Sequence, residues 1–180
     1  MRLVVRIAFG MVIAATPVVA AEPTGEWRIA NGAANIRIEN CGGALWGVVS
    51  WEQVPGRDNQ NPDPALRGRP MLGVPILVGM KETTQQGWGG PPQQRWEGHI
   101  YNAENGQMYS GNIRLVNPNT LRVEGCVLGG VFCGGQDWTR AAQAALQGAS
   151  QTKGINPKVA GKSAVNDVCS RLSNLPGRAH

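Results

Sequence analysis

The residues with the clearest chemical potential lie in the segment Asp58–Pro70, which reads DNQNPDPALRGRP. Its carboxylate and amide oxygens could bind a cation, and Asn59, Asn61 and Asp63 have the alternating spacing of ligands in a calcium-binding loop. That template also requires a glycine and a later glutamate at positions where this chain has prolines. Because both requirements fail, the sequence predicts no metal site in this segment.

The same segment has the features of a rigid loop. Asn61 and Asp63 each precede a proline, which keeps their backbones extended, and both side chains can accept hydrogen bonds from following backbone amides as Asx turns. Arg67 and Arg69 could pair with Asp58 or Asp63. These contacts favour a loop that stabilises itself. The alternative is a flap that gates or recognises a ligand through Asp58, Asn61, Asp63, Arg67 and Arg69.

Catalysis has little support in the sequence. His99 is the one histidine before the C-terminal residue, and it lies alone on the polar face of a predicted strand. The chain has no Gly-x-Ser-x-Gly motif and no glycine-rich phosphate loop between a strand and a helix. We therefore expect no catalytic residues and no cofactor. An unrecognised enzyme, to be tested first through His99 and Asp63, is the remaining alternative.

The N-terminal residues 1–21 have the composition of a secretory signal peptide. Met1–Arg6 carries two arginines, Ile7–Val19 is apolar and uncharged, and small residues precede Glu22. The apolar run is too short to span a bilayer as a helix. We expect export to the periplasm or secretion, and a soluble mature chain that has one domain over residues 22–140.

Export also decides how the four cysteines are interpreted. Disulfides persist in oxidising compartments, and an even number of cysteines suggests a disulfide framework. A metal site is the weaker alternative, because the chain has no Cys-x-x-Cys pair and no histidine near a cysteine. The four cysteines are Cys41, Cys126, Cys133 and Cys169.

Short runs broken by turn residues about every ten positions follow Gly25, which is typical of an all-β sandwich or barrel. Several runs alternate between apolar and polar residues, as strands with one dry and one wet face do. Eight strands in sequence favour a closed antiparallel up-and-down barrel, because closure removes exposed edges. The predicted strands are Gly25–Ala30, Asn35–Asn40, Leu45–Glu52, Met71–Met80, Arg95–Tyr101, Gln107–Asn117, Thr120–Leu128 and Val131–Arg140.

Gly129-Gly130 predicts the register of the last two strands. If these glycines form a two-residue hairpin loop, Cys126 faces Cys133 at a hydrogen-bonded position. Cross-strand Cα atoms lie about 4.5 to 5.5 Å apart, which is within disulfide range. We therefore predict a disulfide between Cys126 and Cys133. Two free thiols and a wider loop are the alternatives.

In a barrel of this topology, alternate loops lie at the same end. The loops near residue 32 and at residues 53–70, 103–106 and 129–130 should share one end. The Asp58–Pro70 segment is part of the longest of these loops. It should therefore stand over one mouth of the barrel.

The first and last strands of a closed barrel are neighbours, which predicts how the barrel closes. Trp27 and Arg140 should meet at one end, with the guanidinium over the indole ring, in a contact worth about 0.5 to 2 kcal/mol. Gly25 precedes this tryptophan and Trp138 precedes this arginine. All four belong to the predicted closure.

Two resemblances rest on these residues. Gly25-Glu26-Trp27 and Arg140 resemble the closed end of lipocalin-type barrels, which use a Gly-x-Trp on the first strand and an arginine on the last. Between Gly25 and Arg140, the blocks NPDPALRGRP, LGVPILVGM, WEGHIYNAENGQMYSG, LRVEGCVLGG and QDWTR are similar, in order, to a bacterial exported family, domain of unknown function 2147. This resemblance implies a lipocalin-like barrel with no established activity. The chain departs from the family at Trp46, where a second cysteine is expected soon after Cys41.

The composition changes after residue 140. Residues 141–180 hold five basic residues and one acidic residue, whereas residues 22–140 hold ten basic against eleven acidic residues. The domain is therefore nearly neutral, and the net charge of +5 gives no support to nucleic-acid binding. We expect a basic, flexible tail with short helices, because five residues recur at helical spacing: Val165, Val168, Cys169, Leu172 and Leu175. Cys169 could reach Cys41 or remain a free thiol.

Two functions fit this architecture. The barrel could bind a small apolar molecule or lipid in its lumen, or it could be a solid scaffold that binds another envelope protein through its loops or tail. The polar strand faces and the tail argue against an outer-membrane barrel, so we expect no membrane-spanning segment after removal of the leader. Six aromatic residues could line a cavity or fill a solid core: Trp46, Trp51, Trp88, Trp96, Tyr101 and Tyr109.

Overall fold

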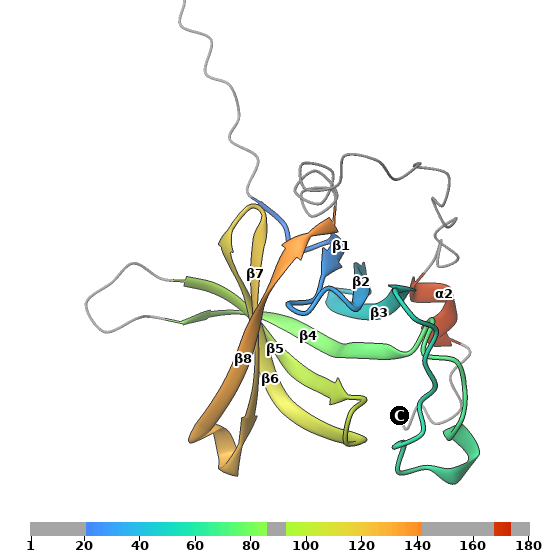
Figure 1. Ribbon diagram of the computed structural model, residues 1–180. Coiled ribbons are helices and arrows are strands. Elements are labelled where there is room, and N and C mark those ends of the chain that lie inside the picture. Colours follow the sequence, from blue (N-terminus) through green and yellow to red (C-terminus); the bar gives the residue numbers. More distant parts are fainter. Residues whose placement is uncertain (1–20, 86–92, 142–167, 174–180) are drawn as a thin grey trace, which may run out of the picture.

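The computed structural model describes residues 21–85, 93–141 and 168–173, and shows a closed antiparallel barrel whose strands follow one another in chain order (Figure 1). This arrangement confirms the predicted fold. The predicted leader and most of the tail lie outside the described residues. In the described part of the chain, the strands are β1 (Gly25–Arg28), β2 (Ala34–Cys41), β3 (Ala44–Glu52), β4 (Pro75–Gln85), β5 (Gln93–Asn102), β6 (Gln107–Asn117), β7 (Thr120–Val127) and β8 (Phe132–Arg140), and the helix is α2 (Val168–Ser173).

The largest difference from the predicted strands concerns β4, which begins after the predicted Met71–Met80 run has started and extends beyond it. Val74 N donates to the carbonyl oxygen of Met71, so residues 71–74 form a turn before the strand. Inside the strand, Gly79 has a φ of 60° and the register with β5 shifts nearby. An apolar run alone does not distinguish a turn from a strand, which explains the error.

One end of the barrel, which we call the closed end, is filled by side chains. The turns β2–β3 and β6–β7 lie there, and the indoles of Trp27 and Trp138 are fully or almost fully buried. Around them pack the apolar side chains of β2 to β7, in one continuous cluster. Its other members include Ile38, Leu45, Leu77, Met80, Trp96, Ile113 and Leu121.

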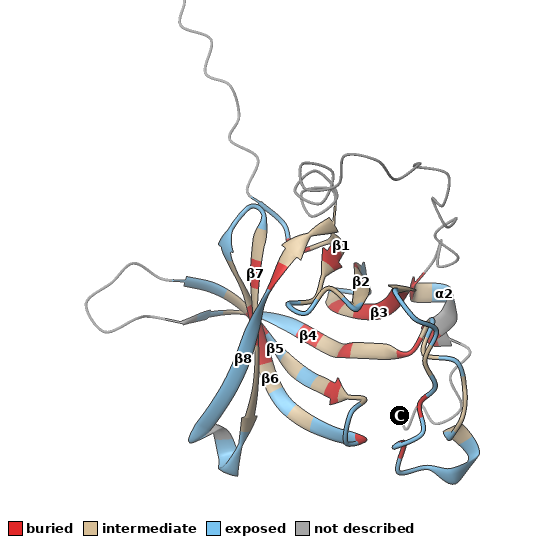
Figure 2. Cartoon of the chain, viewed as in Figure 1, coloured by how far each residue is buried: buried red, intermediate tan, exposed pale blue. Residues whose placement is uncertain are grey.

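The barrel closes over a short seam between β1 and β8. The two strands pair at two positions, Trp27 with Arg140 and Arg28 with Thr139. Upstream of this seam, β8 is exposed from Phe132 to Asp137, which Figure 2 shows as its pale blue half. Pairing between β1 and β8 therefore closes the barrel at the closed end, whereas the rest of β8 towards the opposite end has no such partner in β1.

The alternation of dry and wet faces holds inside the barrel, but several outer-face positions are buried, and two of them carry an aromatic or aliphatic side chain. Tyr101 follows the inward-facing Ile100, so strict alternation would place it on the wet face, yet it is buried. Val48, on the outer face of β3, has no solvent exposure. In both cases another segment of the chain covers the outer face, and alternation along one strand carries no information about such a cover.

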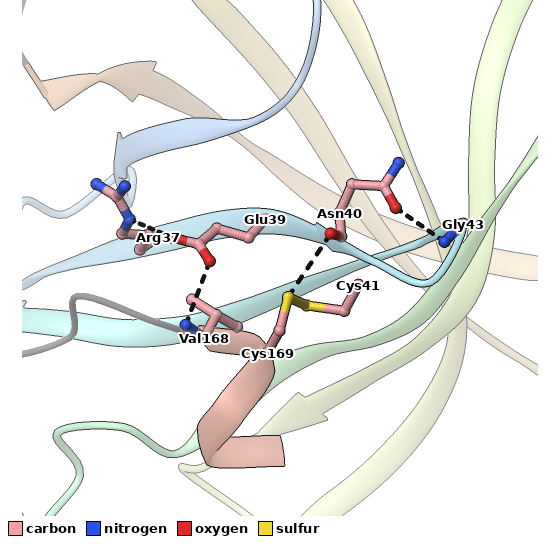
Figure 3. Close-up of a disulfide and its surroundings, with 7 residues drawn as sticks. All are labelled: Arg37, Glu39, Asn40, Cys41, Gly43, Val168 and Cys169. Atoms are coloured by element: carbon pink, nitrogen blue, oxygen red, sulfur yellow. Dashed lines mark hydrogen bonds and ion pairs between the residues drawn. A yellow bond between two sulfur atoms is a disulfide. The ribbon is translucent and has the colours of Figure 1, made fainter. Parts of the chain in front are cut away.

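Helix α2 is the cover over β3. Val168 and Leu172 pack against Val48, with Trp46 and Cys41 beside them. Cys169 forms a disulfide with Cys41, and Val168 N donates to the carboxylate of Glu39 at 3.2 Å (Figure 3). The choice left open between a bridged and a free Cys169 is therefore decided in favour of the bridge, and the helical spacing in the tail corresponds to a real helix.

The hairpin between β7 and β8 has the predicted register but not the predicted loop. Cys126 pairs with Cys133 and the two form a disulfide, with Val127 opposite Phe132 as the last pair. Residues 128–131 form a four-residue loop, so the two-residue loop is wrong. Because the longer loop makes Val127 and Phe132 the closing pair, the hydrogen-bonded and non-hydrogen-bonded positions along the two strands exchange places. The Cα atoms of the cysteines lie 4.1 Å apart, nearer the spacing of a non-hydrogen-bonded pair.

Candidate ligand-binding cavity

The other end of the barrel, which we call the mouth, is hollow. A cavity of about 920 Å³ opens there, between the ends of the strands and the loops that join them. Pockets for small molecules usually measure about 300 to 1,000 Å³. The predicted alternative of a barrel packed solid throughout its length is therefore correct only for the closed end.

The wall of this cavity is mainly apolar because each strand turns its inward-facing residues towards it. Val123, Gly125 and Val127 follow one another at every second position of β7, and Phe132, Gly134 and Gln136 do so on β8. The remaining strands and loops contribute aliphatic and aromatic side chains: Ile29, Ala34, Ile36, Val49, Met71, Ile76, Ile100 and Tyr109. A surface of this composition favours an apolar ligand over a charged one.

Polar groups are found at the rim. Tyr101, Asn102 and Glu104 lie along one side of the mouth. Tyr109 accepts a hydrogen bond from Asn105 Nδ2 at 2.8 Å, so its hydroxyl points to the rim rather than to the floor. The arrangement places polar atoms where a ligand enters and apolar atoms where its body lies.

The loop that contains Asp58–Pro70 is fixed beside this mouth by a buried carboxylate. Asp58 has no solvent exposure, and its Oδ1 accepts a hydrogen bond from the Tyr101 hydroxyl at 2.5 Å. Its Oδ2 accepts hydrogen bonds from Asn61 Nδ2 at 2.8 Å and from Arg69 Nε at 3.0 Å. We call these four side chains the Asp58 anchor. They join the loop to the end of β5.

The anchor changes the acidity of two of its members. Burial alone would raise the pKa of Asp58, but the hydrogen bonds from Tyr101, Asn61 and Arg69 together lower it below its usual value. Burial and the hydrogen bond to the Asp58 carboxylate raise the pKa of Tyr101 to about 12. At neutral pH the carboxylate is therefore charged and the phenol is a permanent donor.

The rest of the segment forms the local structure that its prolines and amides predict. Asn61 Oδ1 accepts from Asp63 N, and Asp63 Oδ1 accepts from Ala65 N, both at 2.9 Å, so both side chains form Asx turns. Arg69 forms an ion pair with Asp58, which is one of the pairings that the sequence suggested. Arg67 instead donates to the carbonyl oxygens of Asn61 and Pro62. The loop thus stabilises itself through most of its polar groups.

This loop lies at the mouth, as the topology predicts. Its Gln60 backbone lies so close to Gly106, in the β5–β6 turn, that a Cβ at Gly106 would overlap the Gln60 carbonyl. Met71, just after the segment, lines the cavity. Sequence reasoning missed Tyr101 as the partner of Asp58, because the two are 43 positions apart and no local pattern connects them.

The predicted closure residues meet at the opposite end. The Arg140 guanidinium lies over the Trp27 ring, 4.3 Å from its centroid, and donates to the carbonyl oxygens of Glu22, Thr24 and Pro118. Trp27 Nε1 donates to Pro23 O at 2.7 Å. These contacts hold the start of β1 against the end of β8.

His99 and most of the aromatic candidates that the structure describes lie apart from the cavity. His99 is exposed on β5. Among the described residues, no group of three His, Cys, Asp or Glu side chains could hold a metal ion, and no helix is long and apolar enough to cross a membrane. Of the six aromatic residues, Tyr101 and Tyr109 line the cavity, Trp96 is in the core, and Trp46 packs near α2. Trp51 lies under Arg28, and Trp88 is outside the described residues.

Comparison with known proteins agrees with this fold. The model of a family described as "Uncharacterized protein conserved in bacteria (DUF2147)" matches residues 25–140. No curated protein matches the chain. A solved structure, HP1028 from Helicobacter pylori, described as belonging to the lipocalin family, superimposes with a TM-score of 0.58 at 17% sequence identity, covering 76% of this chain and 94% of that one. At this identity the likeness concerns the fold alone.

Proposed function

Since the chain belongs to the DUF2147 family of uncharacterised bacterial proteins, whose barrel here is lipocalin-like, we propose that it binds a small, largely apolar molecule in the cavity at its mouth. The observation that supports this most is the cavity itself, about 920 Å³ with a mainly aliphatic and aromatic wall. Apolar surface of this kind gains free energy when it is covered by a ligand rather than by water.

We propose binding without catalysis. Three of the groups that could transfer protons are not available in the cavity: Asp58 and Tyr101 hydrogen-bond each other, and His99 is exposed on the outside of the barrel. In this proposal the Asp58–Pro70 segment, through Asp58, Asn61, Asp63, Arg67 and Arg69, positions one side of the entrance. Its rigidity favours a fixed rim over a moving lid.

The proposal places the protein in the periplasm, with residues 1–21 as a removable leader and residues 22–140 as the binding domain. Two disulfides support an oxidising compartment. N-terminal sequencing of the exported protein should begin at Glu22, and a protein that retains residues 1–21 and stays in the cytoplasm would contradict the location. Binding of another envelope protein through the tail stays a prediction.

Cavity filling tests the binding site. Gly134 lines the cavity, and a Cβ at this position would meet no atom within 4 Å, so Gly134→Phe fills the cavity without a backbone clash. We expect this variant to bind the uncharged fluorescent probe N-phenyl-1-naphthylamine at least about tenfold more weakly than the wild type. Mass spectrometry of gently purified wild-type protein should also show a co-purifying apolar molecule.

Ser110→Phe is the matched control. Ser110 is exposed and pairs with Cys126 on the outer face, so the same bulk is added outside the cavity. Its affinity should stay within about twofold of the wild type. Equal affinities for the two variants, or no probe binding by the wild type, would reject the cavity as the binding site.

A further inference from the structure

The tip of the β7–β8 hairpin exposes an unusual run of apolar side chains. Val127, Leu128, Val131 and Phe132 are 45%, 73%, 72% and 63% exposed. Single exposed apolar residues are common on protein surfaces, but a contiguous group usually marks an interaction site. We call these four residues the apolar tip.

The chain holds the apolar tip outward at a conformational cost. Leu128 has a φ of 51°, and among the described residues it is the one non-glycine residue in the left-handed region. For a bulky residue this backbone costs about 1 to 2 kcal/mol, and asparagine or glycine would adopt it more easily. The disulfide between Cys126 and Cys133 fixes the base of the tip. A leucine in this conformation, largely exposed to water, points to an apolar partner.

The tip is also free of charge and continuous with the cavity. Residues 125–136 contain no Asp, Glu, Lys or Arg. Val127, Val131 and Phe132 line the cavity as well as the tip, whereas Leu128 does not line the cavity. An apolar molecule could therefore pass between the tip and the cavity without crossing a charged rim on this side.

Two arginines at the same end of the barrel form no ion pair with a carboxylate of the described residues, although Asp63 and Glu104 are exposed at this end as well. Arg57 and Arg67 are exposed on the loop before β4, and their guanidinium groups donate to the backbone carbonyl oxygens of Gly68, Asn61 and Pro62. A carbonyl oxygen does not neutralise a guanidinium charge as a carboxylate does. The two arginines therefore suit an anionic headgroup layer beside an inserted tip.

The area of the tip favours a lipid surface over a second protein molecule. Burial of four side chains of this size removes roughly 250 to 500 Å² from water, whereas a stable protein interface buries about 800 Å² on each partner. Insertion into a bilayer needs no complementary partner surface, and its strength increases with buried apolar area and with attraction to anionic lipids.

We propose that the apolar tip inserts into an anionic lipid surface, so that the mouth faces the membrane when an apolar ligand is exchanged. The exchange step rests on the proposed function, but insertion does not. Vesicle binding and cavity binding are measured separately, so either can fail alone.

Vesicle flotation with the complete chain tests insertion. The wild type should bind vesicles of phosphatidylcholine with phosphatidylglycerol, and should bind pure phosphatidylcholine more weakly. Leu128→Asn removes the most exposed side chain of the apolar tip, suits the left-handed backbone and leaves the cavity wall unchanged. We expect it to lower vesicle affinity about tenfold, because one buried leucine accounts for that much.

Val116→Asn is the matched control, since Val116 is 51% exposed on β6 at the closed end. Its vesicle affinity should stay within about twofold of the wild type. No vesicle binding by the wild type, or equal loss in both variants, would overturn the proposal. A dimer in sedimentation that Leu128→Asn dissociates, with vesicle binding unchanged, would replace the lipid surface with a second copy of the chain.

Discussion

Asp58 is a charged side chain without solvent contact, and the loop at the mouth depends on how that charge is compensated. Arg69 provides the opposite charge, while Tyr101 and Asn61 complete its hydrogen bonds. The buried carboxylate and the arginine stabilise the loop only together, because removal of one charge leaves the other without compensation.

Asp58→Asn should therefore lower the free energy of unfolding by about 3 kcal/mol at pH 7. The folded pKa of Asp58 lies below its ordinary value of 3.8, so the carboxylate stabilises the fold above that pH and loses this effect as the pH falls through the folded pKa. The difference between wild type and variant should shrink when urea unfolding is repeated at about pH 3.

Asp63→Asn serves as its control. Asp63 is exposed and accepts one hydrogen bond as a turn cap, which asparagine can also accept. Its effect should stay below about 1 kcal/mol at either pH. Equal losses for the two variants would show that Asp58 has no special role.

At the scale of single residues, the sequence predicts contacts between residues that are close along the chain. The Asx turns of Asn61 and Asp63 follow from the prolines after them, within two residues. The bond from Tyr101 to Asp58 depends on how a loop folds back over the barrel, and no spacing along one strand contains that information.

At the scale of strands, closure of the barrel depends on the short pairing of β1 with β8. Arg140 compensates for the small number of strand hydrogen bonds by donating to three carbonyl oxygens and covering the Trp27 ring. Gly25 belongs to the same arrangement, because its φ is 113° and a Cβ there would lie 2.9 Å from Arg140 Nη1.

Arg140→Lys should lower the free energy of unfolding by about 1 to 3 kcal/mol, although it keeps the charge. An ammonium cannot span the three carbonyl oxygens and the ring as a planar guanidinium does. Arg114→Lys, at a half-buried position on β6, is the comparison, and thermal unfolding should change little. A lysine at position 140 as stable as arginine would mean that the seam does not depend on the guanidinium.

Turn residues and alternation predict the eight strands. The errors concern strand ends and loop lengths, which depend on packing against other parts of the chain. The β7–β8 register follows from the two cysteines and the glycines between them. The loop length does not, because residues 128 and 131 are as apolar as strand residues and only their exposure separates them from the strands.

At the scale of the whole molecule, two disulfides act over very different distances. Cys41 and Cys169 are separated by 128 residues and hold α2 to the barrel, whereas Cys126 and Cys133 are separated by 7 and close one hairpin. In the chain-entropy model the longer closed loop restricts the unfolded chain more.

Replacing Cys41 and Cys169 by serine should therefore lower the free energy of unfolding by up to about 5 kcal/mol, against about 2 to 3 kcal/mol for the Cys126 and Cys133 pair. Urea unfolding of both double variants measures the difference. The first variant should also expose Val48, because α2 is released from β3. The opposite order of stability would show that the length of the closed loop does not determine how much each disulfide stabilises this protein.

The overall fold was the most predictable part, since strand count, order and closure all follow from the pattern of the chain. The docking of α2 was only half predictable. Its helical spacing is visible, but its place on the barrel depends on a distant cysteine and on an outer face that one strand cannot reveal.

The seam described above has a further consequence for selectivity. Strand pairing between β1 and β8 ends at Arg28 and Thr139, and beyond it a hydrogen bond from Ala30 N to Gln136 Oε1 links the two sides. Towards the mouth, the barrel is therefore joined here by one side chain and not by a strand ladder. A single side-chain hydrogen bond gives way more easily than a ladder, so a bulky ligand should be accommodated on this side of the entrance first.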